Sequence, residues 1–185
     1  LRDDRERDAE GSFVPVEGMD VDVVHLPVLD PTYEWDVLDV ERRDLLAHRY
    51  GDILRTFGGR FVDALDAIAT ADGAVAYHCA VGKDRTGVVA AMVLDLLGVG
   101  HHLIVHDYSL SALGMARVKE WLVANDPDEA RVWLQQPPAW LGSPPAAMAS
   151  FLAHLHAEHG GAEGYLRARG VPAGTIAALR DNLLR

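Results

Sequence analysis

The sequence predicts an α/β fold in which a small, mostly parallel central sheet is flanked by helices. Two short apolar runs, residues 21–28 and 74–77, have the length and composition of strands. Much of the remaining chain carries apolar residues at helical spacing. Helices on both faces of a small sheet are therefore the economical architecture.

The expected elements have recognisable boundaries. Gly58 and Gly59 divide the long amphipathic stretch over residues 40–70 into two helices. Asp72 and Gly73 form the turn into the second strand, and Gly98 ends the helix that follows it. The expected order is a strand over 21–28, a turn over 30–35, helices over 40–70, a strand over 74–77, and helices over 85–97, 101–113, 115–124, 146–158, 162–169 and 173–184.

Length and composition indicate one domain, residues 1–185, without a disulfide framework. The chain holds a single cysteine, and 49% of its residues are hydrophobic. A net charge of −11 argues against nucleic acid as a partner. No stretch is apolar enough to cross a bilayer, and no signal-peptide pattern is visible. The sequence leaves open whether the protein is cytoplasmic or secreted, and what its oligomeric state is.

The segment from His78 to Gly87 carries the chemistry. A loop between a strand end and a helix start presents backbone N–H groups and partial positive charge to an anion. Cys79 begins this loop, where a thiol beside such donors and a guanidinium ionises readily. Arg85 ends it, and its planar fork can bind two oxygens of a phosphate. The segment predicts a phosphate cradle with a nucleophile at its floor; the alternative is a buried structural cysteine.

This segment reads His-Cys-Ala-Val-Gly-Lys-Asp-Arg-Thr-Gly. It resembles the signature loop of the cysteine-dependent protein tyrosine phosphatases, and its Lys83-Asp84 pair resembles the bacterial branch that acts on phosphotyrosine and phosphoinositides. Residues 105–111 and 164–180 are also similar to that family. The resemblance implies a tyrosine-phosphatase-like fold. A strand ending in Asp-Leu-Arg lies upstream in that family, so we expect a truncated N-terminus.

Each residue of the loop has an expected role. Cys79 attacks phosphorus as a thiolate. Thr86 either donates a hydrogen bond to the Cys79 sulfur or bonds only backbone, and by resemblance His78 orders the loop through backbone carbonyls. The phosphate oxygens are held by the Arg85 guanidinium and by the backbone N–H groups of Ala80, Val81, Gly82, Lys83, Asp84 and Arg85.

The general acid is the harder assignment. Many tyrosine phosphatases use an Asp upstream of the Cys, often within Trp-Pro-Asp, and this chain has no such tripeptide. Asp84 is the favoured candidate, because a carboxyl beside a bound phosphate keeps its proton more readily. The alternative is that Asp84 only forms an ion pair with Lys83 or an upstream arginine. Asp30, just after the first strand, is the second candidate for the acid.

Lys83 is expected to affect substrate choice, because an extra cation suits the second phosphate of a phosphoinositide head group. The alternative is that Lys83 is a solvent-facing lysine without such a role.

The histidines lack the spacing of a zinc site and are expected to be structural. We therefore expect no metal and no other cofactor. These histidines are His101, His102, His106, His154, His156 and His159.

Residues 126–145 hold five prolines and two tryptophans. This segment is either a helical, lid-like insertion that excludes water from the active site, or a loop whose aromatic side chains pack on the core.

The whole pattern predicts a protein-tyrosine phosphatase, which is a phosphoric monoester hydrolase. Its expected substrates extend from phosphotyrosine to phosphoserine, phosphothreonine or phosphoinositides. The alternatives are a small-metabolite phosphatase and a phosphate-binding pseudophosphatase without turnover.

Overall fold

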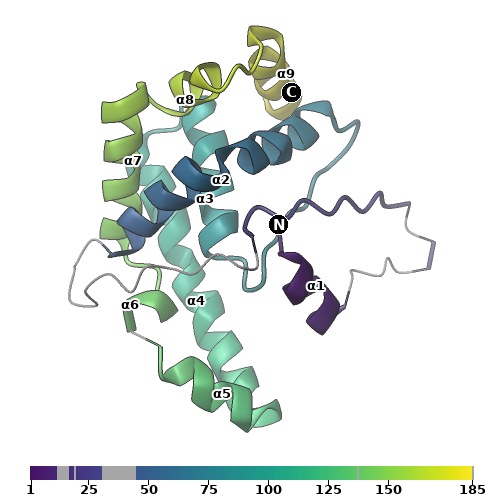
Figure 1. Cartoon of the computed structure of the whole chain (residues 1–185), viewed down its shortest axis with the longest axis vertical. Helices are drawn as coiled ribbons and strands as arrows, with labels where there is room; N and C mark the ends of the chain where they lie inside the picture. Colours follow the sequence, from purple (N-terminus) through teal and green to yellow (C-terminus); the bar gives the residue numbers. More distant parts are fainter. Residues whose placement is uncertain (12–16, 19, 31–44, 137, 185) are drawn as a thin grey trace.

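Helix α3 (Asp84–Leu96) lies at the centre of the fold, as the computed structural model in Figure 1 shows. The structure describes residues 1–11, 17, 18, 20–30, 45–136 and 138–184. Helix α3 contacts α2 (Leu45–Thr70), α4 (His101–Asn125) and α8 (Ala162–Ala168). Because partners surround it, α3 is apolar on most faces, and its buried apolar residues are Val88, Val89, Ala91, Met92, Val93 and Leu96.

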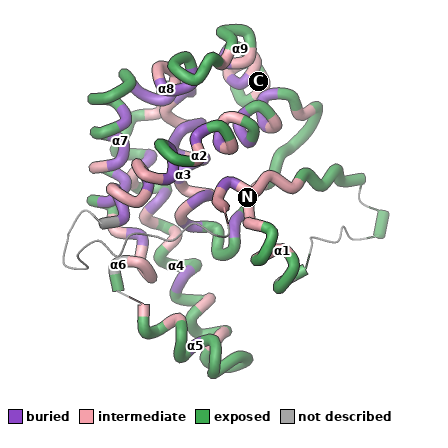
Figure 2. Tube along the Cα trace, viewed as in Figure 1, coloured by how far each residue is buried: buried purple, intermediate pink, exposed green. Residues whose placement is uncertain are grey.

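The other helices pack around this centre. Helix α7 (Pro145–His159) lies against α2 and α4, while α9 (Ala173–Leu183) covers part of α2. Figure 2 shows the buried residues on the facing sides of these helices, whereas the lower part of α4 is largely exposed. The short helices α5 (Pro127–Leu134) and α6 (Pro138–Leu141) follow α4, and α1 (Asp4–Glu10) stands near the chain start.

The predicted α/β fold is wrong for the part of the chain that the structure describes, which is helical and contains no strand. Residues 21–28 and 74–77 are extended but pair with no neighbouring strand there. A strand exists only where a partner takes up its backbone N–H and C=O groups. Most valines of these runs are accordingly left exposed, including Val24 at 64% and Val75 at 42%, and only Val28 is buried in the core.

The helix boundaries agree better with the sequence. Helix α2 has a kink at Phe57, where φ is −115° and ψ is 18°, directly before the predicted division at Gly58. Helices α7, α8 and α9 confirm the last three predicted helices, and α3 ends with Gly98 in the left-handed region at φ 78°. The turn over 31–35 and the start of the 40–70 stretch lie outside the described residues.

The division of residues 101–124 into two helices is wrong. Helix α4 continues through Gly114, although a glycine inside a helix costs about 1 kcal/mol relative to alanine. Buried contacts of Ile104, Tyr108 and Met115 on both sides of the glycine outweigh that cost. Among the described residues, no helix has the length and apolar character needed to span a membrane.

Candidate active site

The loop over residues 78–83 leads directly into the first turn of α3. Gly82 has a φ of 70°, a left-handed conformation that glycine adopts without strain. Helix α3 begins at Asp84, and no side chain caps its N-terminus. The first N–H groups of a helix need partners from outside the helix. The loop therefore leaves backbone donors and the positive end of the α3 dipole available to an anion.

Cys79 lies beneath this loop and is only 2% exposed. Burial alone would raise the pKa of its thiol, but the charge of Arg85 and hydrogen bonds from Thr86 and the Gly82 backbone outweigh burial and lower that pKa. The Thr86 hydroxyl is buried and makes no hydrogen bond of standard geometry with the described residues, so it is left to stabilise the Cys79 thiolate whose pKa it lowers. The arrangement favours a thiolate.

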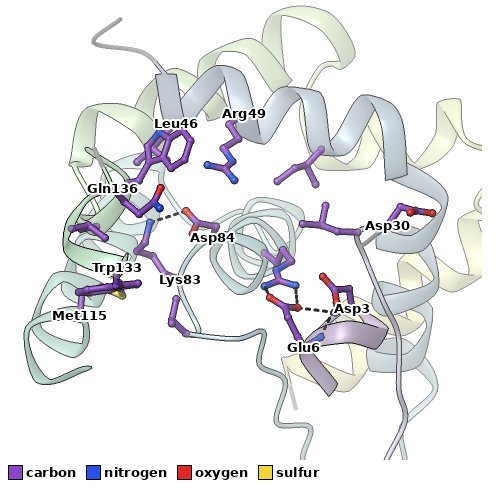
Figure 3. Close-up of a pocket in the computed structure, with 16 residues that line it drawn as sticks. Asp3, Glu6, Asp30, Leu46, Arg49, Lys83, Asp84, Met115, Trp133 and Gln136 are labelled. Carbon is purple, nitrogen blue, oxygen red and sulfur yellow. Dashed lines mark hydrogen bonds and ion pairs between the residues drawn. The ribbon is translucent and has the colours of Figure 1, made fainter. Parts of the chain in front are cut away.

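Arg85 is held from the side by Glu6 of helix α1. Its Nη1 and Nη2 atoms donate to the two Glu6 carboxylate oxygens, each at 2.5 Å (Figure 3). Glu6 is itself fixed by a capping box, in which its backbone N–H donates to Asp3 Oδ1 at 2.9 Å and its carboxylate accepts from the Asp3 N–H at 2.8 Å. The guanidinium is thus oriented before any ligand binds.

Lys83 is buried, at 1% exposure, which excludes the solvent-facing alternative. Its Nζ donates to Asp84 Oδ1 at 2.8 Å. The same oxygen accepts from the Tyr50 hydroxyl at 2.7 Å, and the Tyr50 and Tyr108 hydroxyls lie 2.6 Å apart. Burial, followed by the nearby Asp84 charge, raises the pKa of Tyr50 far above its usual value, so Tyr50 stays a donor.

A cavity of about 310 Å³ opens above the loop. In Figure 3, Asp84 and Arg49 lie near its centre, Trp133 and Met115 form one side, and Asp30 lies on the other. Arg49 of α2 stands 4.4 Å from the ring centre of Trp140, a cation–π distance. The described lining residues are Asp3, Glu6, Leu29, Asp30, Leu46, Arg49, Ile53, Val81, Lys83, Asp84, Arg85, Met115, Trp133, Gln136, Trp140 and Leu141.

The structure places only part of the predicted site in this cavity, because Cys79 lies beneath the loop and is not among the described residues that line it. His78 Nδ1 lies 2.9 Å from the Cys79 carbonyl oxygen, which fits a loop-ordering role. Lys83, Asp84 and Arg85 line the cavity with Asp30. The ion pair between Lys83 and Asp84, the competing interpretation of that carboxylate, is also present. Ala80 and Gly82 are exposed on the loop and Val81 lines the cavity, so the backbone there is open to a ligand.

The model of the tyrosine phosphatase family matches residues 1–185, the full chain. The chain belongs to the tyrosine phosphatase family. A tyrosine-protein phosphatase from Nostoc commune is 38% identical over 119 residues, which are 62% of this chain and 40% of that protein. The chain therefore spans less than half the length of that relative.

This result confirms the predicted family. Three residues at the candidate site were missed in the sequence: Glu6, Arg49 and Tyr50. Glu6 had a readable signal, because Asp3 and Glu6 have the spacing of a capping box. Arg49 and Tyr50 had none, since they lie in a helical pattern that also describes an ordinary packing face.

Proposed function

We propose that the protein hydrolyses phosphotyrosine monoesters through a phosphocysteine on Cys79. The observation that carries this proposal is the placement of the buried Cys79 at the start of the loop that leads into the uncapped N-terminus of α3, where the charge of Arg85 lowers the pKa of its thiol. A thiolate is the nucleophilic form of cysteine, and the guanidinium placed by Glu6 can hold two phosphate oxygens. Membership of the tyrosine phosphatase family supports the same reaction.

The reaction proceeds in two balanced steps. In the first, the Cys79 sulfur bonds to phosphorus as the bond from phosphorus to the phenolic oxygen breaks, and a general acid gives its proton to the departing phenol. In the second, water attacks phosphorus, the same carboxylate takes a proton from that water, and the sulfur leaves as a thiolate. Thr86, through its hydroxyl, stabilises that thiolate. Inorganic phosphate is the product.

Asp84 is the proposed general acid, and Asp30 is the second candidate. Asp84 lines the same cavity as Arg85, its neighbour in the sequence, which supports its role. Its hydrogen bonds from Lys83 and Tyr50 restrict its carboxylate to one orientation. Asp30 also lines the cavity but stands farther toward its edge, 3.7 Å from Arg60 Nη2.

Phosphoserine, phosphothreonine and phosphoinositides are included in the proposal. Three cations, Arg49, Lys83 and Arg85, line the same cavity, and a substrate with a second phosphate can interact with more than one of them.

Trp133 and Trp140, both from residues 126–145, form part of the cavity wall. We propose that this segment acts as a lid that excludes water while the phosphoryl group is on sulfur.

A small phosphorylated metabolite is the second candidate substrate. The cavity volume of about 310 Å³ lies at the small end of the range for ligand pockets, which favours a compact molecule over a long peptide. The loop chemistry is the same for both, so the difference lies in the cavity walls alone.

The deciding experiment measures phosphate release by the wild type and Cys79→Ser. The substrates are a phosphotyrosine peptide, a phosphoserine peptide and a phosphoinositide in mixed micelles. We expect release by the wild type and none by the variant, with inorganic phosphate still bound by the variant in calorimetry. Turnover by Cys79→Ser would overturn the mechanism. A wild type that binds phosphate but releases it from no ester would instead indicate a pseudophosphatase. A wild type that hydrolyses only small phosphate esters, and none of these three substrates, would indicate a metabolite phosphatase.

A further inference from the structure

A second cluster of polar side chains lies at the opposite end of helix α3 from the loop over residues 78–83, the candidate phosphate loop. It consists of Asp95 in the last turn of α3, His101 at the start of α4 and His156 in the last turn of α7. Asp95 lies eleven residues beyond Asp84, roughly 16 Å along the helix axis. The cluster is therefore separate from the cavity that holds Arg85.

The three side chains converge on one point. His156 Nε2 lies 2.7 Å and His101 Nε2 lies 3.2 Å from the same oxygen, Asp95 Oδ1, and the two nitrogens are 3.0 Å apart. The rings meet nearly edge to face, with an interplanar angle of 70°. Three ligand atoms from three different helices thus form a closed triangle.

Hydrogen bonds alone cannot pair all three of these atoms well. Each imidazole Nε2 has a single proton or a single lone pair in the ring plane, so it can serve one partner well. If both rings donate to Asp95 Oδ1, their two N–H groups face each other across 3.0 Å. Around a tetrahedral Zn²⁺, with ligand bonds of about 2.0–2.1 Å, neighbouring ligand atoms are roughly 3.3 Å apart. The observed spacings need only a small expansion to reach that geometry.

The surroundings hold the carboxylate in a ligating orientation. Asp95 Oδ2 accepts a hydrogen bond of 2.8 Å from the backbone N–H of Ala162, which leaves Oδ1 toward the histidines. The Asp95 side chain is 8% exposed, whereas the side chains of His101 and His156 are 44% and 41% exposed. Gly161 keeps space beside the cluster, because a Cβ there would lie 2.9 Å from Asp95 Oδ2 and from His156 Nε2.

We propose that Asp95, His101 and His156 bind a Zn²⁺ ion. Two imidazole nitrogens and one carboxylate oxygen form a donor set that zinc accepts, and solvent reaches the fourth position through the exposed side of the histidines. The ion would connect the ends of α3, α4 and α7, with the first residue of α8 attached through Asp95. Its role is structural, since the phosphate loop lies at the other end of α3.

The sequence predicts these histidines to be structural, because the spacing does not reveal the site. Asp95 and His101 are six positions apart, but His156 comes from 55 positions beyond His101. Only the packing of α7 against α4 brings them together.

The test uses Cys79→Ser as the background, because a thiolate also binds zinc. Zinc is titrated into this protein by calorimetry, and thermal unfolding is followed at each concentration. We expect one ion per chain and a rise in Tm of about 5–10 °C at free zinc near a hundred times the dissociation constant. Both effects should be lost in His101→Ala and in His156→Ala.

Matched controls come from neighbouring histidines. His102 lies beside His101 on α4, and His154 lies on α7 with His156. The variants His102→Ala and His154→Ala should therefore bind zinc as well as the Cys79→Ser protein does. Circular dichroism verifies that each variant is folded, and visible absorption of bound Co²⁺ reports the ligand geometry independently of stability. Absence of binding by the background protein, or equal binding by His101→Ala and His102→Ala, would overturn the proposal. Neither outcome bears on the phosphatase reaction.

Discussion

Glu6 and Arg85 form a two-point ion pair across 79 positions of the chain. Burial would raise the pKa of the Glu6 carboxyl, but the hydrogen bonds and charge of Arg85 outweigh burial and lower it, so the pair is charged at neutral pH. Helix α1 therefore takes part in the site by orienting the guanidinium that the phosphate loop supplies.

Replacing this carboxylate should weaken catalysis. Glu6→Gln keeps the shape but loses the charge that orients Arg85, and a hydrogen bond to a charged group is worth about 1.5–3 kcal/mol. We expect kcat/KM for a phosphotyrosine peptide to fall by about ten- to a hundredfold. Asp8→Asn, an exposed change on the same helix, should leave it unaltered. Equal values for the wild type and Glu6→Gln would show that Arg85 needs no support.

The ionisation of Cys79 is open to direct measurement. Because its pKa is lowered in the folded protein, alkylation by iodoacetamide should reach half its maximal rate at a lower pH than in the urea-unfolded chain. Arg85→Met should move that midpoint upward. The same shift stabilises the fold: the contribution is fully present above the unfolded pKa of the thiol and is lost as pH falls through the folded one. Identical midpoints in both states would contradict the loop electrostatics.

The identity of the general acid can be read from leaving groups. An acid matters most when the departing phenol is a poor leaving group, so loss of the acid should steepen the dependence of kcat on the phenol pKa. We expect Asp84→Asn to slow a poor leaving group at least tenfold more than a good one, and Asp30→Asn to slow both alike. The reverse pattern would assign the acid to Asp30.

Gly58 and Gly59 should respond oppositely to alanine. A Cβ at Gly58 would lie 2.1 Å from Tyr165 Oη and from Arg169 Cζ, whereas one at Gly59 meets nothing within 4 Å. Tyr165 is held by a hydrogen bond of 2.7 Å to the Leu54 carbonyl, so it cannot move freely. We expect Gly58→Ala to lower the free energy of unfolding by about 1–3 kcal/mol and Gly59→Ala to raise it by up to about 1 kcal/mol. Urea titration measures both, and equal effects would contradict this packing.

Removal of metal ions by EDTA should affect the stability of the protein but not its phosphatase reaction. EDTA is expected to leave phosphate release unchanged, because the proposed mechanism uses only Cys79, Arg85 and a carboxylate. If zinc occupies the Asp95 cluster, the same treatment should lower Tm. Loss of turnover at a temperature where circular dichroism shows an intact fold would require a metal in the reaction.

Local features were predicted well and long-range pairing was not. The end of α3 at Gly98 and the kink beside Gly58 could be predicted because the conformational preferences of glycine act within a few residues. Val24 and Val75 misled the fold prediction, since an apolar extended run becomes a strand only if a partner lies beside it. The periodicity of a single segment contains no information about that partner.

The sequence by itself determined the candidate loop over residues 78–83 and the start of α3, because Cys79, the backbone donors and Arg85 are contiguous and their spacing sets how they can face one anion. Tertiary structure alone decided what supports that loop: Glu6 on Arg85, Tyr50 on Asp84, and Arg49 in the cavity wall. It also decided the meeting of Asp95, His101 and His156. The physical reason is that contacts between distant residues depend on how whole helices pack, and many sequence positions together determine that packing.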